Sequence, residues 1–221
     1  MRRSILVVAL ALAPAVSQGA IIQWTDWTSA TLAGAAGSAG GVGVTFTGSL
    51  LFAQLSNGTM VGAGASPTTD YWIENAPAPY TNNAVVSNRP PGFELLAFNG
   101  PSTNTLSFGS PIVNPIMAIV SMGQSGVAVT YDFDTPFTVL SEGWGFWGDG
   151  TYSLGLGDTL TGRELHAAIQ FQGTVSQIQW TSTAENWHGF TVGAPVPEPG
   201  TMGLLVAGLV GLGARVRNRR R

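Results

Sequence analysis

The residues that could carry out chemistry are few and lie in the C-terminal half of the chain. The two histidines are His166 and His188, and Glu185 precedes the second of them at the i, i+3 spacing. A carboxylate beside an imidazole is the composition of a general-base site. Neither a Gly-x-Ser-x-Gly elbow nor a His-Glu-x-x-His sequence accompanies this pair, and such motifs would be needed to place it in a known hydrolase geometry. We therefore expect structural histidines and predict that the protein is not an enzyme.

Acidic side chains offer two further chemistries. Asp132 and Asp134 alternate along one stretch, which puts both carboxylates on one strand face about 7 Å apart, a separation compatible with glycoside hydrolysis. A solvated strand face explains the same spacing. Asp149 and Asp158 are hard oxygen donors, and residues 155–160 (Gly-Leu-Gly-Asp-Thr-Leu) partly resemble one copy of a calcium-binding β-roll repeat. We expect no cofactor and no metal, with calcium at Asp149 and Asp158 as the alternative.

Tryptophans provide the clearest indication of ligand binding. Trp144 and Trp147 lie among glycines, and Trp187 precedes His188 later in the chain. A flat aromatic ring in a loop is a natural platform for a sugar ring, so these three residues form a candidate carbohydrate site. The alternative is that they fill the hydrophobic core.

The body of the chain, residues 21–194, is strongly acidic. It contains eleven acidic residues and two arginines but no lysine, a formal net charge of −9, whereas both ends of the chain are basic. Phosphate binding needs clustered lysine or arginine, so we exclude a nucleic-acid partner. The chain has no cysteine, which excludes disulfides, a thiol nucleophile and a cysteine-ligated metal.

The elements that must position these candidates are strands. Residues 127–134 (Val-Ala-Val-Thr-Tyr-Asp-Phe-Asp) alternate apolar and polar, and residues 165–172 alternate likewise, with His166 on the polar face. Helix signals are nearly absent, while Gly, Pro, Asn and Asp recur between short apolar runs. The pattern predicts an all-β fold, a β-sandwich or jelly roll. Further strands are expected near 42–54, 93–98, 105–108, 116–122, 137–141, 178–180 and 189–193.

Two longer segments do not fit the strand pattern. Residues 33–43 are rich in Gly, Ala and Ser, which is typical of a flexible loop. Residues 62–88 are rich in Pro, Asn and Thr, and we expect a long surface connection there.

Both ends of the chain have the composition of targeting segments. Residues 1–20 combine a short basic start, an apolar stretch and small residues near 17–20, which predicts a signal peptide. At the other end, Pro197, Glu198 and Pro199 precede the apolar run 202–214, which would form a single transmembrane helix of about 20 Å against a hydrocarbon core of about 30 Å. The apolar residues of this short anchor are Met202, Leu204, Leu205, Val206, Leu209, Val210 and Leu212. The basic cluster that follows, expected on the cytoplasmic side, is Arg215, Arg217, Arg219, Arg220 and Arg221.

This order of Pro-Glu-Pro, glycine-rich apolar run and terminal arginines resembles the PEP-CTERM sorting signal of Gram-negative, exopolysaccharide-producing bacteria. The resemblance implies recognition of Pro197, Glu198 and Pro199 by an exosortase, a membrane-embedded cysteine protease that removes the tail. It also implies secretion machinery as a partner. Proteins with this tail are sometimes labelled with an ice-binding protein C-terminal domain, a label that is no evidence of ice binding. Residues 114–193 resemble, less specifically, the exported β-domains that PEP-CTERM proteins often carry.

The sequence thus predicts three parts: a signal peptide at 1–20, an extracellular β-sandwich at 21–194 and a sorting tail at 195–221. We expect an inner-membrane-anchored precursor and a mature protein at the cell surface or in the extracellular matrix. The predicted function is a structural or adhesive component associated with exopolysaccharide, as in a biofilm. A lectin-like carbohydrate-binding module is the alternative, and a secreted hydrolase is the third hypothesis.

Overall fold

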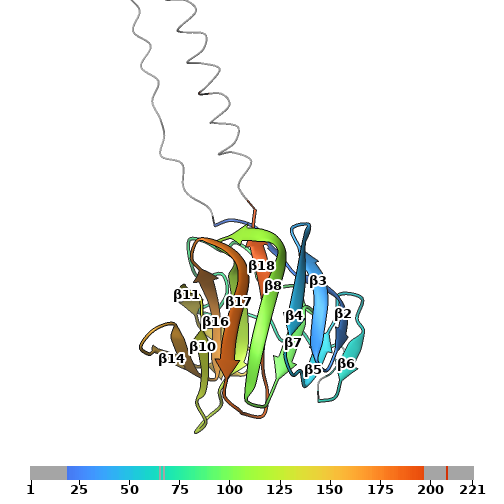
Figure 1. Ribbon diagram of the computed structural model, residues 1–221. Helices are drawn as coiled ribbons and strands as arrows, with labels where there is room; N and C mark the ends of the chain where they lie inside the picture. Colours follow the sequence, from blue (N-terminus) through green and yellow to red (C-terminus); the bar gives the residue numbers. More distant parts are fainter. Residues whose placement is uncertain (1–18, 65, 67, 197–207, 209–221) are drawn as a thin grey trace, which may run out of the picture.

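Two antiparallel sheets packed face to face form the body of the protein (Figure 1). The computed structural model describes residues 19–64, 66, 68–196 and 208. The first sheet consists of β1 (Ile22–Trp24), β5 (Phe52–Gln54), β6 (Met60–Gly62), β7 (Leu95–Phe98), β9 (Ile116–Met122), β11 (Phe137–Glu142), β16 (Leu165–Phe171) and β18 (His188–Pro195). Its order is β11-β16-β9-β18-β7-β5-β6, with β1 also paired to β18.

The second sheet has the order β14-β15-β10-β17-β8-β4-β3-β2. Its strands are β2 (Asp26–Thr31), β3 (Gly34–Ala39), β4 (Val42–Thr47), β8 (Ser102–Val113), β10 (Val129–Phe133), β14 (Thr151–Leu154), β15 (Thr159–Arg163) and β17 (Thr174–Ser182). A separate small hairpin is formed by β12 (Trp144–Gly145) and β13 (Gly148–Asp149). The predicted all-β sandwich is confirmed.

The main core lies between the two sheets. Strand β10 buries Val129, Tyr131 and Phe133 and turns the residues between them outward, as its alternation predicts. From the other sheet, Phe190 packs against Trp180 with ring centroids 5.2 Å apart. Burial of these aromatic side chains from both sheets is the main force that holds the sandwich together.

A second hydrophobic cluster covers the outer face of the first sheet. Strand β9 is buried along its whole length, so its two faces contact different clusters. The connection between β6 and β7 supplies the cover, because Trp72 and Tyr80 are fully buried with ring centroids 5.4 Å apart. The expectation of a surface connection is therefore wrong for these side chains: the segment lacks long strands but forms a packed layer.

Two other local predictions are corrected by the structure. Residues 33–43 are not a flexible loop; they form most of the β3–β4 hairpin, with Gly40 and Gly41 at positive φ in its turn. The small residues are needed because a side chain at Gly37 would collide with the carbonyl of Asp26 on β2. The strand expected at 42–54 is two strands, β4 and β5, which belong to different sheets.

Both ends of the described domain meet at one end of the sandwich (Figure 1). Ile22 of β1 is paired with Pro195 of β18, and the Val196 N–H donates to the Ile21 carbonyl at 2.9 Å. The predicted signal peptide, apart from its last residues 19 and 20, lies outside the described residues. So do the Pro-Glu-Pro motif, the arginine cluster and, except for residue 208, the apolar run. Within the described ranges, no helix has the length and apolar character that crossing a bilayer requires.

Candidate functional site

A pocket of about 270 Å³ opens at the end of the sandwich opposite Pro195, beside the loop that connects β17 to β18. Ser121 and Gln124 come from the end of β9 and the turn that follows, and Trp147 comes from the β12–β13 hairpin. Glu164 lies between β15 and β16. The β17–β18 loop completes the lining with Glu185, Asn186 and Trp187.

The backbone around this pocket adopts unusual conformations. Ser121 and Glu164 have φ values of 53° and 51°, in the left-handed region that residues other than glycine rarely adopt. Between them, Gly123 has a φ of 82°, and a side chain there would collide with the Gly162 carbonyl. In residues other than glycine, such conformations cost about 1 to 3 kcal/mol each and cluster at binding and active sites. The left-handed conformations of Ser121 and Glu164 therefore support the interpretation of this pocket as a binding site.

The two pocket tryptophans are held by a row of aromatic contacts. The Trp147 ring packs on Phe146 with centroids 4.9 Å apart, and Phe146 packs on Tyr71, also at 4.9 Å. Tyr71 in turn packs edge-on to Trp187 at 5.1 Å. Because Tyr71 belongs to the buried second cluster, this row fixes one indole relative to the other. Trp147 nevertheless stays 53% exposed and is open to a ligand.

His166 supports the hairpin that carries Trp147. It is fully buried, not on a polar face as its place in the alternation predicted, because the β12–β13 hairpin covers β16 on that side. Its Nε2 accepts a hydrogen bond from the Trp147 N–H at 3.4 Å, and its Nδ1 lies 3.4 Å from the Tyr80 hydroxyl. Gly145 packs directly against the imidazole, where any side chain would clash. Burial lowers the His166 pKa to about 4, so the ring is neutral.

Two carboxylates with raised pKa values lie in the pocket. Burial raises the pKa of Glu185 to about 7; the Gly123 N–H, donating to Oε1 at 2.6 Å, opposes this shift, and the charge of Glu164 adds to it. Burial also raises the pKa of Glu164, against hydrogen bonds from the Ser125 backbone and the Ser121 side chain. The contribution of the Glu164 charge to the pKa of Glu185 indicates that the two carboxylates share one electrostatic environment.

The predicted Glu185–His188 pair exists, but the histidine lies behind the pocket. The His188 Nδ1 is 3.6 Å from Glu185 Oε1, and the imidazole is fully buried between Phe98 and Tyr131. Burial lowers the His188 pKa to about 3. Neither ring nitrogen has a hydrogen-bond partner among the described residues, and His188 does not line the pocket. This geometry suits a structural histidine better than a general base.

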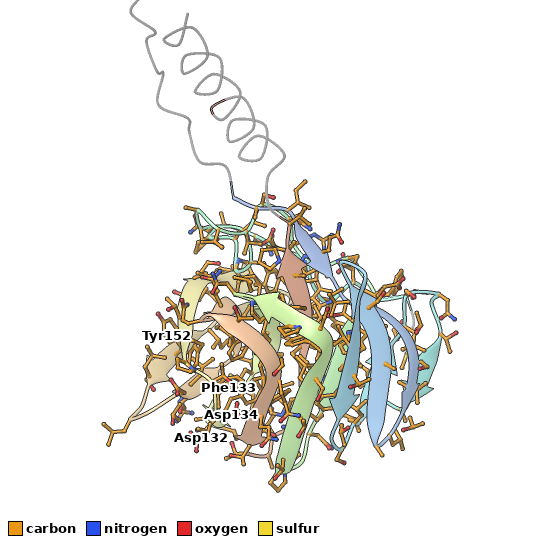
Figure 2. All side chains as sticks on the ribbon, turned by 45° about the horizontal axis from the view of Figure 1, so that its top comes forward. Asp132, Phe133, Asp134 and Tyr152 are labelled. Atoms are coloured by element: carbon orange, nitrogen blue, oxygen red, sulfur yellow. The ribbon has the colours of Figure 1, made fainter. Side chains whose placement is uncertain are left out.

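Asp132 and Asp134 occupy a different place, a shallow hollow where β10 and β17 pair in the second sheet. Figure 2 shows both next to Phe133, where β10 ends, with Tyr152 apart from them. Asp134 Oδ1 accepts hydrogen bonds from the Gln179 N–H and the Thr135 hydroxyl, both at 2.8 Å, and Asp132 accepts one from the Thr159 hydroxyl at 3.1 Å. Both carboxylates therefore have protein donors and lie outside the tryptophan pocket.

The calcium candidates are not brought together. Asp149 ends β13, just before β14, and Asp158 lies at the far end of the β14–β15 hairpin. Across the described part of the chain, no group of three or more His, Cys, Asp or Glu side chains is arranged to hold a metal ion.

Two of the three tryptophans predicted to form a carbohydrate platform lie in the pocket, and the third does not. Trp147 and Trp187 line the pocket, whereas Trp144 is 49% exposed on the same hairpin but is not part of the lining. Sequence reasoning did not single out Ser121, Gln124, Glu164 or Asn186 as site residues. Their roles depend on three turns meeting at one end of the sandwich, and no local pattern encodes that meeting.

The last strand of the domain, β18, leads directly into a targeting sequence. Residues 195–220 match the PEP-CTERM protein-sorting motif. The predicted resemblance is confirmed over this segment, which starts at Pro195, the last residue of β18. The PEP-CTERM motif implies processing by an exosortase, and hence export, a membrane-anchored precursor and sorting to the cell surface. No curated protein and no solved structure matched the chain.

Proposed function

We propose that this protein is a carbohydrate-binding component of the extracellular matrix, delivered to the cell surface through its PEP-CTERM tail. The observation that carries the proposal is the pair of indoles, Trp147 and Trp187, which line one pocket and are held by aromatic contacts. Sugar rings bind through their apolar faces to such aromatic surfaces, and their hydroxyl groups need nearby hydrogen-bonding groups. Ser121, Gln124 and Asn186 provide those groups.

The direction of β18 supports this role. The pocket lies beside His188 at the start of the strand, and the sorting motif begins at Pro195 at its end. The eight residues of β18 span about 26 Å. In a membrane-anchored precursor the pocket would therefore face away from the bilayer, where it can reach polysaccharide before and after processing.

We further propose that the pocket binds its ligand without cleaving it. A glycosidase needs an acid that can reach the glycosidic oxygen and a second carboxylate to assist the reaction. Glu164 and Glu185 have the required composition, but the Glu185 side chain is only 1% exposed, and Gly123 occupies one of its oxygens. Prolonged incubation with bound oligosaccharides, followed by mass spectrometry, should recover them intact.

A purely structural or adhesive role is the second candidate. It is favoured by the β14 edge of the second sheet, where Tyr152, Leu154 and Leu156 are exposed, Leu156 at 98%. An exposed apolar edge strand can associate with other chains.

Binding of the full-length chain in detergent to a glycan array and to purified exopolysaccharide tests the proposal. Replacing Trp147 with alanine should weaken binding about fivefold or more, because a ring face of this kind contributes about 1 kcal/mol or more. Trp144→Ala is the matched control, since that indole has a similar exposure outside the pocket lining. Equal losses in both variants, or no glycan binding by the parent chain, would contradict carbohydrate recognition at this pocket.

A further inference from the structure

The pocket is distinguished from an ordinary sugar site by its charge. Glu164 and Glu185 both line it, and no lysine or arginine is among the described residues of the lining. The surrounding domain is also acidic, with a net charge of −9 over residues 21–194. Of its two arginines, Arg89 pairs with Asp70 at 2.8 Å, and Arg163, the residue before Glu164, is not part of the lining and forms no ion pair among the described residues. The field in the pocket therefore favours cations and repels anionic sugars.

Two different features of the pocket would stabilise a positive charge. An indole face attracts an ammonium group through its quadrupole, and such cation–π contacts are strongest with tryptophan. Here two indoles, Trp147 and Trp187, border the same space as the two carboxylates. Aromatic rings combined with carboxylates are the composition that recognises organic ammonium groups.

Among the described residues, neither carboxylate forms an ion pair with lysine or arginine. Glu185 is covered by protein and bound by the Gly123 N–H, and the imidazole of His188, 3.6 Å from its Oε1, is held neutral by burial. Glu164 is only partly buried and is the carboxylate that a ligand can contact. A cation placed between them would remove the repulsion that raises the pKa of Glu185.

We propose that the pocket selects a glycan that carries a protonated amine, such as a chain containing unacetylated amino-sugar residues. The ammonium group would lie against Glu164 and the indole of Trp147, with Glu185 behind it, while the sugar ring stacks on the exposed aromatic face. This inference rests on the proposed carbohydrate-binding function and names its ligand class. Acetylation would remove the charge, and a uronic acid would reverse it.

The test compares three oligosaccharide series of equal length with the full-length chain in detergent at about pH 7 and low salt. The series are β-1,4-linked glucosamine, its N-acetylated form and an oligogalacturonate, measured by isothermal titration calorimetry. We expect the glucosamine series to bind at least about tenfold more tightly than the acetylated series, and the galacturonate series to bind most weakly. The glucosamine preference should shrink as salt is added.

Substitutions locate the effect. Glu164→Gln should weaken glucosamine binding about tenfold while changing binding of the acetylated series less than about twofold, and Glu185→Gln should act in the same direction. Glu94→Gln is the matched control, because burial also raises the pKa of Glu94 to about 7 but this residue lies outside the pocket lining. Circular dichroism of each variant shows whether it is folded, and Glu164→Gln provides the test if Glu185→Gln is not.

Each outcome decides between the claims. Equal or tighter binding of the acetylated or galacturonate series would overturn the amine inference and leave carbohydrate binding intact. No binding of any series, or of other glycans on the array, would overturn both. A glucosamine preference that survives in both Glu164→Gln and Glu185→Gln would place the amine elsewhere and would also overturn the inference.

Discussion

Replacing Glu185 with glutamine should make folding stability less sensitive to alkaline pH. The folded-state pKa of Glu185 is about 7, raised from its ordinary value of 4.5 chiefly by burial. A carboxyl group with a raised folded-state pKa supports the folded state fully below its unfolded-state pKa, and this support is lost as pH rises through the folded-state pKa. Between those two values the parent protein must therefore lose stability that a neutral amide would keep.

The magnitude follows from the size of the shift. A shift of this size corresponds to at most about 3.4 kcal/mol, and solvent in the adjoining pocket reduces the expected effect to about 1 to 2 kcal/mol. Glutamine resembles the protonated acid and can still accept the hydrogen bond from the Gly123 N–H. The parent and Glu185→Gln should thus be equally stable near pH 4.5, the glutamine variant being more stable by about 1 to 2 kcal/mol near pH 8.

Urea unfolding followed by tryptophan fluorescence at a series of pH values measures this difference. Glu94→Gln is the companion measurement, since Glu94 has a similarly raised pKa and accepts the Trp27 N–H at 2.7 Å. A stability difference for Glu185→Gln that does not change with pH, or that favours the parent at alkaline pH, would refute the description of Glu185 as a buried carboxylate beside an acidic neighbour.

Three further predictions concern other parts of the molecule. Gly145→Ala should destabilise the protein by about 2 to 4 kcal/mol in urea unfolding, because the new methyl group would overlap the buried ring of His166; a change below about 0.5 kcal/mol would contradict the packing of the hairpin. Because burial lowers the pKa values of His166 and His188 to about 4 and about 3, their NMR signals should not titrate between about pH 7.5 and 5, whereas midpoints near 6.5 would show exposed rings. Alanine substitutions throughout 197–199 should stop tail removal and retain the protein in the membrane fraction on immunoblots of fractionated cells; unchanged release would contradict sorting through this motif.

The sequence predicts the strands well wherever alternation is strict. Residues 127–134 and 165–172 contain β10 and β16. Alternate residues of β10 are buried, as the pattern predicts, whereas β16 is buried on both faces. Residues 33–43 mislead because small residues, typical of loops, are required where β2, β3 and β4 approach closely. The exposure of His166 is predicted wrongly, because the β12–β13 hairpin covers the face of β16 that carries this histidine.

The candidate site could be predicted only in part. Trp147 and Trp187 are recognisable from residue type, since exposed-looking tryptophans in loops are informative alone. The partnership of Glu164 with Glu185 is different, because it depends on a turn between β15 and β16 meeting the β17–β18 loop in three dimensions. The left-handed conformations of Ser121 and Glu164 also have no signature in residue type, unlike that of Gly123.

The most direct test of the central claim is a glycan titration followed through the indole N–H signals of the tryptophans by NMR, with each signal assigned by single Trp→Phe substitution. Binding at the pocket predicts saturable shifts for Trp147 and Trp187, which line it, and none for Trp144, which does not. Shifts confined to Trp144 or to Trp180, which lines the hollow beside Asp132 and Asp134, would place the ligand elsewhere and contradict the account.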